Sequence, residues 1–211
     1  MSKAYFISGI DTDAGKTYVT AYIARCLMER GERVITQKFI QTGCTDFSED
    51  IEVHRRLMGT GMLPEDLDHT TAPVIFTYPA SAQLAARIDG REIDLEAIDS
   101  ATRRLLTRYD IVLIEGAGGL AVPITDEFLT IDYIASRRLP LILVTNGILG
   151  SISHTVLSLQ AAAAHGLEVA AVIYNTHFDS DAVIAADTRG FIERYVARHF
   201  PEAIFATAPT L

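Results

Sequence analysis

The chain has 211 residues, of which 49% are apolar and 21% are charged, with a mean hydropathy of +0.21. This length and composition exclude a disordered chain and predict a single domain over residues 1–211. The formal charge of -9 disfavours nucleic-acid binding, because an acidic surface repels a phosphate backbone.

Short apolar runs alternate along the chain with longer amphipathic stretches. The runs are rich in Val, Ile and Leu and mostly continuous, which is typical of strands that are covered on both faces of a parallel sheet. They predict strands at residues 4–8, 33–38, 111–115, 141–145, 169–174 and 203–206.

Four helices are predicted between these strands, at residues 16–30, 95–108, 151–165 and 181–200. Gly31 and Gly166 are stop signals for two of them, and Asp94 is a plausible N-cap for another. Strand–helix alternation predicts an α/β fold, a doubly wound and mostly parallel sheet with helices on both faces. Such sheets bind ligands at the carboxyl ends of their strands.

The segment after the first strand reads GIDTDAGKT. In the phosphate-loop pattern G-x-x-x-x-G-K-[ST], Gly15, Lys16 and Thr17 fit, whereas Gly9 comes one residue early and Ile10 takes the strict position. An ordinary turn before a helix is the alternative. The combination of strand, Gly-Lys-Thr and helix favours a nucleotide site of the P-loop NTPase type.

Three features of this loop suit the binding of a triphosphate. Its amides open a helix whose positive end faces the anion, Lys16 reaches the β- and γ-phosphates, and Thr17 offers a hydroxyl to Mg²⁺. The amides belong to Asp13, Ala14, Gly15, Lys16, Thr17 and Tyr18.

The second strand ends in QKFIQTG. Lys38 at this position could bind a second anion near the γ-phosphate or form a surface ion pair, and its spacing does not favour either. Downstream, Asp50 and Glu52 are candidate Mg²⁺ ligands, because hard cations prefer carboxylate oxygens. The alternative is that both belong to the acidic first turn of a helix.

The third strand ends in IVLIEGAGGL, so Glu115 follows four apolar residues at the end of the sheet. A carboxylate there can hold the Mg²⁺ hydration shell as a Walker B acid does. Gly116, Gly118 and Gly119 let the backbone approach a ligand. A tight turn would explain these glycines but not the carboxylate.

The fourth and fifth strands lead to further polar groups. Gly150, Ser151 and Ser153 open a helix and could bind an anion, although either serine could instead act as an N-cap. Asn175 could hydrogen-bond the edge of a base or form an Asx turn.

The remaining residue types limit the chemistry and the compartment. The six histidines show no metal-ligand spacing, and the two cysteines form no Cys-x-x-Cys motif, which indicates a reducing compartment. The N-terminus lacks the apolar region of a secretion signal, and no apolar run reaches the ~18 residues of a membrane span. We therefore expect a cytoplasmic protein that does not bind membranes.

Four motifs resemble, in the same order, those of the dethiobiotin synthetase family. They are GIDTDAGKT, KFIQTG, EGAGG and LGSISH, and the similarity runs from about residue 4 to 175. Phe39 stands where the family usually has a proline, a difference that we expect to shift Lys38 slightly. The family's Pro-containing loop that closes over adenine would fall at residues 208–211.

The resemblance implies an ATP- and Mg²⁺-dependent homodimer that converts 7,8-diaminononanoate and CO₂ into dethiobiotin. It implies catalytic roles for Lys38, Lys16 and Thr12, and metal binding by Thr17, Asp50 and Glu115. The implied nucleotide site adds Asp13, Ala14, Gly15, Tyr18, Gly116, Gly118, Asn175, Thr176 and Pro209. The implied substrate site comprises Thr12, Lys38, Thr42, Gly118, Gly150, Ser151, Ile152 and Ser153.

Three other classes of protein use similar motifs. ATPase switches of the chromosome-partition type carry an extra lysine early in the loop, where this chain has Asp11. Lys16, Thr17 and Glu115 argue against a non-catalytic nucleotide-binding module. Amide-forming synthetases of the cobyrinate type usually carry a glutaminase domain, for which 211 residues leave no room.

Overall fold

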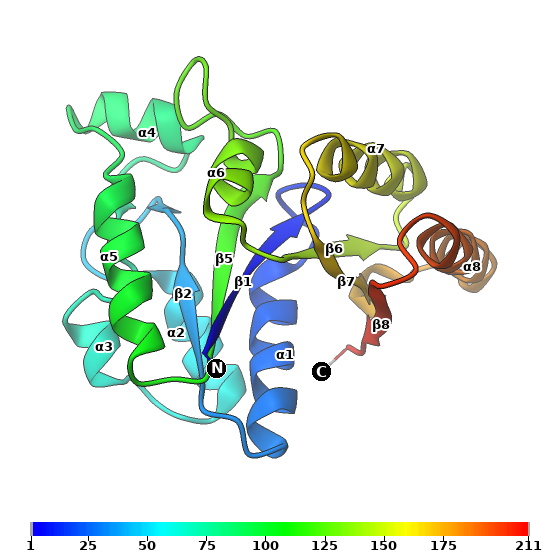
Figure 1. Cartoon of the computed structure of the whole chain (residues 1–211), viewed down its shortest axis with the longest axis horizontal. Coiled ribbons are helices and arrows are strands. Elements are labelled where there is room, and N and C mark those ends of the chain that lie inside the picture. The colour runs from blue at the N-terminus through cyan, green and yellow to red at the C-terminus, as the bar shows by residue number, and fades with distance from the viewer. Residues whose placement is uncertain (1, 211) are drawn as a thin grey trace.

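A computed structural model describes residues 2–210 of the chain. Within these residues, six parallel strands form one sheet in the order β2-β5-β1-β6-β7-β8 (Figure 1). All six predicted strands are present, as β1 (Lys3–Gly9), β2 (Val34–Lys38), β5 (Ile111–Gly119), β6 (Leu141–Asn146), β7 (Val169–Asn175) and β8 (Ile204–Ala208). β2 and β5 lie on one side of β1, and β6, β7 and β8 follow one another on the other side. The direction of the connections therefore changes at β1, and such sheets bind ligands at this kind of switch point.

Strand β5 is longer than predicted, because it continues through the glycines after Glu115. Its end pairs with β1, where Gly119 lies opposite Gly9 after a shift in register. A Cβ atom on Gly116 would lie 2.8 Å from the ring of Phe6. The missing side chain therefore lets the two strands stay adjacent up to the phosphate loop.

The four predicted helices are confirmed, with ends within two residues of the expected positions. They are α1 (Lys16–Glu29), α5 (Leu95–Leu106), α7 (Ser151–Ala164) and α8 (Ala182–His199). Asp94 caps α5 as predicted, since its Oδ1 accepts a 2.8 Å hydrogen bond from the amide of Ala97. No helix among residues 2–210 has the length and apolar character needed to cross a membrane.

Several elements were not predicted, and most of them are short. They are the helices α2 (Glu49–Met58), α3 (Pro64–Leu67), α4 (Ala82–Ile88) and α6 (Thr130–Arg137), the 3₁₀ turn η1 (Thr176–Phe178), and the paired strands β3 (Gln41–Thr42) and β4 (Ile75–Phe76). The segment from β3 to α4 supplies part of the site described below.

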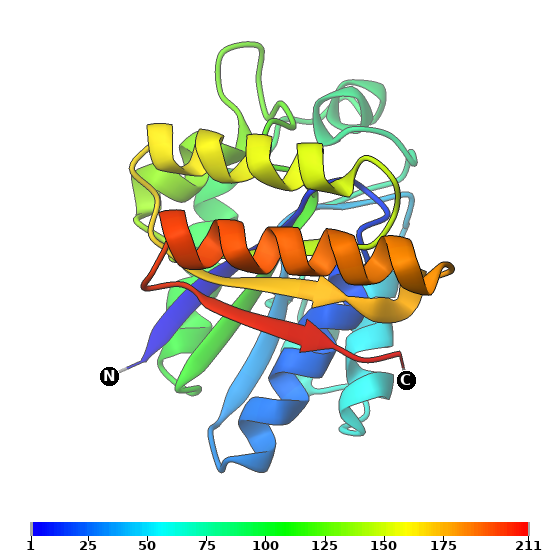
Figure 2. The ribbon, with the colours of Figure 1, turned by 90° about the vertical axis from the view of Figure 1, so that its right-hand side faces the viewer.

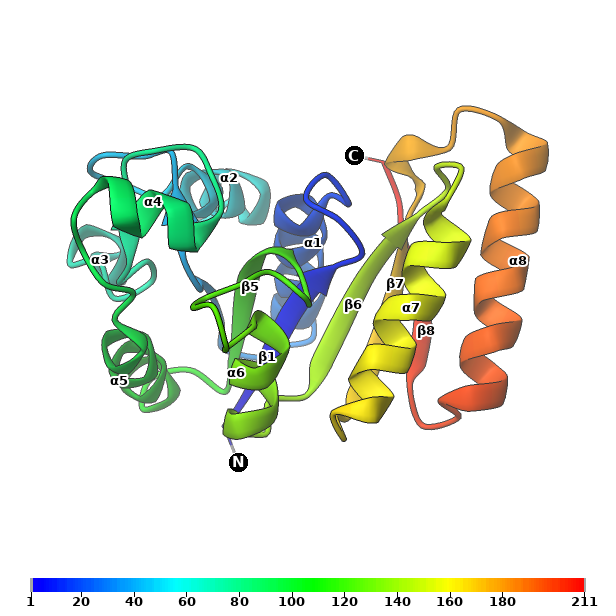
Figure 3. The same ribbon diagram turned by 90° about the horizontal axis from the view of Figure 1, so that it is seen from above.

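Helices cover both faces of the sheet (Figure 3). Side chains of α1 and α2 form one buried apolar cluster with one face, and those of α5, α6, α7 and α8 form a second cluster with the other. Neighbouring residues of β1 divide accordingly, with Phe6 in one cluster and Ile7 in the other. Figure 2 shows α7 and α8 side by side across β7 and β8. The doubly wound arrangement is therefore confirmed.

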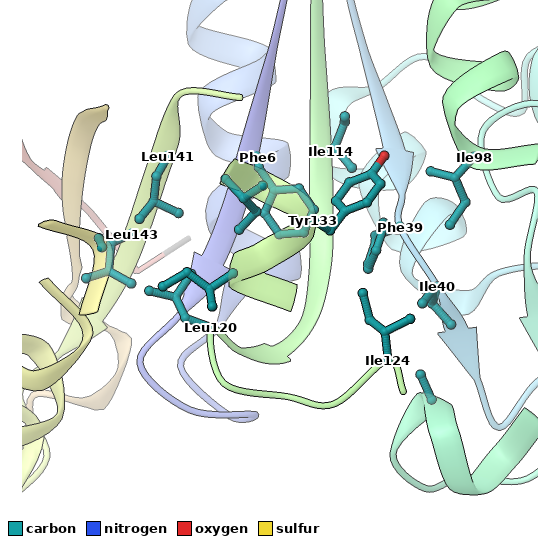
Figure 4. Close-up of a cluster of buried hydrophobic side chains, with 14 of the residues drawn as sticks. Phe6, Phe39, Ile40, Ile98, Ile114, Leu120, Ile124, Tyr133, Leu141 and Leu143 are labelled. Carbon is teal, nitrogen blue, oxygen red and sulfur yellow. The ribbon is translucent and has the colours of Figure 1, made fainter. Parts of the chain in front are cut away.

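Three aromatic rings pack at the centre of the larger cluster (Figure 4). The ring centroid of Phe39 lies 5.3 Å from that of Phe6 and 4.6 Å from that of Tyr133. The amide of Phe39 donates a 2.8 Å hydrogen bond to the carbonyl of Glu115, which a proline at this position could not do. Phe39 thus anchors the backbone next to Lys38 to both the core and β5.

A buried ion pair fixes α2 against the sheet. The Arg55 guanidinium donates two 2.8 Å hydrogen bonds to the carboxylate of Asp66 and a third to the hydroxyl of Thr36 on β2. Both charged groups are almost completely buried. Their bidentate geometry joins α2, α3 and β2 at one point.

Replacing Arg55 with Leu is expected to lower the free energy of unfolding by about 3–5 kcal/mol, because the Asp66 carboxylate would stay buried without its cation. Urea unfolding followed by circular dichroism measures this change. The matched control is Arg33→Leu, which breaks a 2.6 Å ion pair with Asp110 that lies in solvent. A parent-like midpoint for Arg55→Leu would contradict the anchoring role.

Candidate active site

A pocket of about 960 Å³ opens at the carboxyl ends of β1, β2 and β5. Its lining brings together ten of the residues that the sequence predicted, from five separate segments. They are Thr12, Asp13, Gly15, Lys16, Thr17, Lys38, Thr42, Asp50, Glu115 and Gly118. Glu52, the other acidic candidate, is exposed and is not part of this lining.

In the phosphate loop, Gly15 lies just before α1 in the left-handed region with φ 85°. No side chain caps the start of α1, so the helix end is open to an anion. Lys16 folds back over the loop, and its Nζ donates to the carbonyls of Asp11 (3.0 Å) and Thr12 (2.9 Å). The loop is thus already closed around its lysine.

Thr17, Asp50 and Glu115 converge as the metal prediction requires. The Thr17 hydroxyl lies 3.0 Å from Oδ1 of Asp50 and 2.9 Å from Oε1 of Glu115. Asp50 also belongs to the acidic first turn of α2, so that alternative is confirmed for this residue, and its role as a metal ligand stays a prediction. The three groups offer only oxygen donors, the type that Mg²⁺ prefers.

Lys38 is buried among these groups and does not lie on the surface. Its Nζ donates to Oε1 of Glu115 (2.8 Å) and to the carbonyl of Gly116 (3.3 Å), and it forms an ion pair with Asp50. Burial alone would lower the pKa of Lys38, but Glu115 and Asp50 outweigh it and raise that pKa. Burial likewise opposes ionisation of Glu115, yet Lys38 and His54 hold its pKa well below the ordinary value.

The two lysines of the pocket influence each other. Burial, assisted by the Lys38 ammonium, lowers the pKa of Lys16 to about 8, against the opposing effect of Glu115 and Asp50. Both lysines line the same cavity. Two ammonium groups, one at the start of α1 and one at the end of β2, therefore face one space, which suits two adjoining anions.

Tyr18 of the phosphate-loop prediction lies together with the residues predicted to complete the nucleotide site near the base. The Tyr18 hydroxyl donates to the carbonyl of Pro209 (2.7 Å), and the Thr176 hydroxyl donates to that of Ala208 (3.1 Å). Asn175 is buried, with its Nδ2 3.3 Å from the carbonyl of Ala14. Its Oδ1 accepts from the amide of His177, as in an Asx turn. A role in base recognition stays a prediction, and Leu211, the last residue of the expected loop, lies outside the described residues.

The start of α7 is not part of the pocket lining. Gly150 is the N-cap residue there, and the Ser151 hydroxyl donates to Oδ1 of Asn146 (2.5 Å). The alternative that Ser151 or Ser153 caps the helix is therefore wrong, because no side chain caps α7. Substrate binding by Gly150, Ser151, Ile152 and Ser153 stays a prediction.

The sequence missed two groups of site residues. The first comprises apolar or small lining residues without a motif, namely Ile40, Pro79, Ala80, Ala82, Val122 and Phe178, together with the polar Gln41 and Ser81. The second is His54, whose Nε2 lies 2.6 Å from Oε2 of Glu115. Its spacing of four residues from Asp50 within α2 is the only signal that could have indicated it.

Comparisons with known proteins give the family. The model of a family described as an AAA domain matches residues 3–210. The chain is 46% identical over 205 residues to ATP-dependent dethiobiotin synthetase BioD 2 of Pasteurella multocida, covering 97% of this chain and 96% of the relative. It is 52% identical over 198 residues to ATP-dependent dethiobiotin synthetase BioD of Chlorobaculum tepidum, covering 93% and 83%.

The chain belongs to the ATP-dependent dethiobiotin synthetase family. It is accordingly an enzyme of the ligase class, ATP-dependent and built on a P-loop fold. A ParA family ATPase from Chlorobium tepidum has a similar structure, with a TM-score of 0.56 at 16% identity over 100% of this chain and 86% of that one. This second likeness shows the fold alone, and the extra lysine expected of such switches is replaced by the exposed Asp11.

Proposed function

We propose that the chain, acting as a single domain, carboxylates 7,8-diaminononanoate with CO₂ and closes the ring to dethiobiotin, using ATP and Mg²⁺ and releasing ADP and phosphate. The observation that carries this proposal is the convergence of Lys16 and Lys38 on one pocket. A nucleotide-binding module needs the first of these cations. A reaction that joins a triphosphate to a second anion needs both.

The proposed reaction has three steps. One substrate amine attacks CO₂ and loses a proton, giving a carbamate that Lys38 stabilises and that Thr12 and Thr42 orient. A carbamate oxygen then attacks the γ-phosphorus and ADP leaves, while Lys16 neutralises the transferring oxygens. The second amine attacks the carbonyl carbon of this mixed anhydride, loses a proton and expels phosphate, which closes the urea ring. Both amines belong to one chain, so ring closure has the advantage of an intramolecular reaction.

The residues present fit a magnesium ion. Thr17, Asp50 and Glu115 would hold it, and bound Mg²⁺ supplies positive charge to the β- and γ-phosphate oxygens. Among residues 2–210 no group of three or more His, Cys, Asp or Glu side chains is arranged to hold a metal. Two carboxylates and a hydroxyl agree with a Mg²⁺ site that is completed by phosphates and water.

The proposed enzyme is a homodimer with its substrate near the interface. Support comes from exposed apolar side chains at and after the start of α7, with Leu149 79% and Leu157 60% exposed. A second copy covering these side chains would protect them from water. The amides and hydroxyls from Gly150 to Ser153 would then bind the distal carboxylate of the substrate close to that interface.

The reaction itself tests the proposal. With diaminononanoate, bicarbonate, ATP and Mg²⁺, the protein should release ADP and form dethiobiotin in equal amounts, detected by mass spectrometry. The control reactions replace diaminononanoate with DNA or with lipid vesicles. ATP hydrolysis that DNA or vesicles stimulate, without any dethiobiotin, would favour the partition-type switch instead.

Glu115→Gln is expected to raise the Mg²⁺ concentration for half-maximal rate by about tenfold or more, the effect seen when a metal ligand loses its support. The amide keeps the shape of the side chain but removes the charge beside Thr17 and Lys38. A Mg²⁺ titration of the initial rate measures this shift, with the exposed Glu96→Gln as the matched control. An unchanged titration would remove Glu115 from the metal site.

A further inference from the structure

His54 is a buried polar residue that the proposed reaction does not use. It lies on α2, four residues after Asp50, and its side chain is completely buried. Residues at this spacing lie on the same face of a helix, so α2 directs both groups toward Glu115. Lys38 and Thr17 contact the other oxygen of this carboxylate, and Asp50 in turn contacts both of them.

The two oxygens of Glu115 have different partners. Oε1 accepts from the Thr17 hydroxyl at 2.9 Å and from Nζ of Lys38 at 2.8 Å. Oε2 lies 2.6 Å from Nε2 of His54. The histidine thus occupies one oxygen, and the other is left to the threonine and the lysine, both of which line the pocket.

The bonding pattern also fixes the tautomer of the ring. An ionised carboxylate can only accept, so Nε2 of His54 must carry the proton. Nδ1 is buried and has no hydrogen-bond partner in the structure. A proton on Nδ1 would be a buried donor without an acceptor, which costs free energy. The ring therefore donates one hydrogen bond, and that bond goes to Glu115.

We infer that His54 is a positioning residue, which holds Glu115 by Oε2 so that Oε1 faces Thr17 and the Mg²⁺ of the nucleotide. The inference rests on the proposed metal site. Groups that orient a metal ligand through a hydrogen bond change metal affinity by about 10- to 100-fold when they are replaced. The effect of His54 should accordingly appear in Mg²⁺ binding and not in nucleotide binding without metal.

Two variants separate this role from simple packing. His54→Leu keeps an apolar side chain of similar size and removes the donor, whereas His54→Gln keeps an N–H donor at a similar reach. Isothermal titration of Mg²⁺ into the complex with ADP should show affinity at least about tenfold weaker for His54→Leu and near the parent value for His54→Gln. ADP affinity without Mg²⁺ should be the same in all three proteins.

Equal Mg²⁺ affinity in His54→Leu and the parent, or equal weakness in both variants, would overturn the inference. If the parent complex itself binds no Mg²⁺, the result contradicts the proposed metal site and can be told apart from a failure of the inference about His54.

Nitrogen-15 NMR of the histidine rings gives a second test on the unmodified protein. It should show His54 protonated at Nε2 and bare at Nδ1, and the opposite tautomer would overturn the inference even if neither variant folds.

Discussion

Lys38→Ala is expected to lower kcat by about 10²- to 10³-fold, the effect of removing one group that stabilises a developing anion. The reason is that the carbamate would lose its cation, while Lys16 would still bind the phosphates. ATP affinity in the presence of Mg²⁺ should therefore stay close to the parent value. Steady-state rates of dethiobiotin formation and calorimetric titration of ATP measure the two quantities separately.

The matched control for Lys38 is Lys3→Ala, which removes the same charge from the exposed end of β1. Parent-like turnover in Lys38→Ala would remove this lysine from the mechanism. A large fall in ATP affinity with unchanged kcat would instead assign Lys38 to the nucleotide. Both outcomes would contradict the proposed roles, in which Lys38 stabilises the carbamate and Lys16 binds the phosphates.

Gly15→Ala is expected to abolish measurable ATP binding. The left-handed backbone at Gly15 disfavours any side chain, and a Cβ there would collide with Nδ2 of Asn175 and lie 3.4 Å from the ring of Phe178. Asn175 has little freedom to move away, because its amide also contacts Ala14 and His177. Calorimetric titration of ATP checks the loss, with circular dichroism to confirm that the variant folds.

Gly31→Ala separates the two causes of that loss, which are the left-handed backbone and the collision with Asn175. Gly31 lies just beyond the other end of α1 with φ 87°, and a Cβ there would meet nothing within 4 Å. This control should lower the free energy of unfolding by about 1–2 kcal/mol, the cost of the left-handed backbone alone. It should bind ATP like the parent, and tight ATP binding by Gly15→Ala would contradict the assigned role of the loop.

The sequence predicted the sheet and the strand ends well because both depend on local patterns. An apolar run followed by Gly-Lys-Thr, by a lone lysine or by a glutamate places that group at the carboxyl end of a strand. Lys16, Lys38 and Glu115 reached one pocket for this reason. The continuous apolar character of the runs predicted the parallel direction of the strands.

The rest of the site depends on packing between distant segments. Asp50 was one of two acidic candidates, and α2 presents it and not Glu52 to the pocket. The orientation of α2 follows from the buried pair of Arg55 and Asp66, which no spacing reveals. Pro79 and Ala80 line the pocket without any motif, because the segment before α4 happens to fold over it.

The anchoring of α2 couples the stability of the fold to the geometry of the site. This short helix carries Asp50 and His54 toward Glu115, and one residue later Arg55 is tied to Asp66 and Thr36. A change that loosens the anchor must therefore displace a carboxylate and an imidazole together. For anyone re-engineering this enzyme, we expect thermal stability and the response to the proposed Mg²⁺ to change together at this helix.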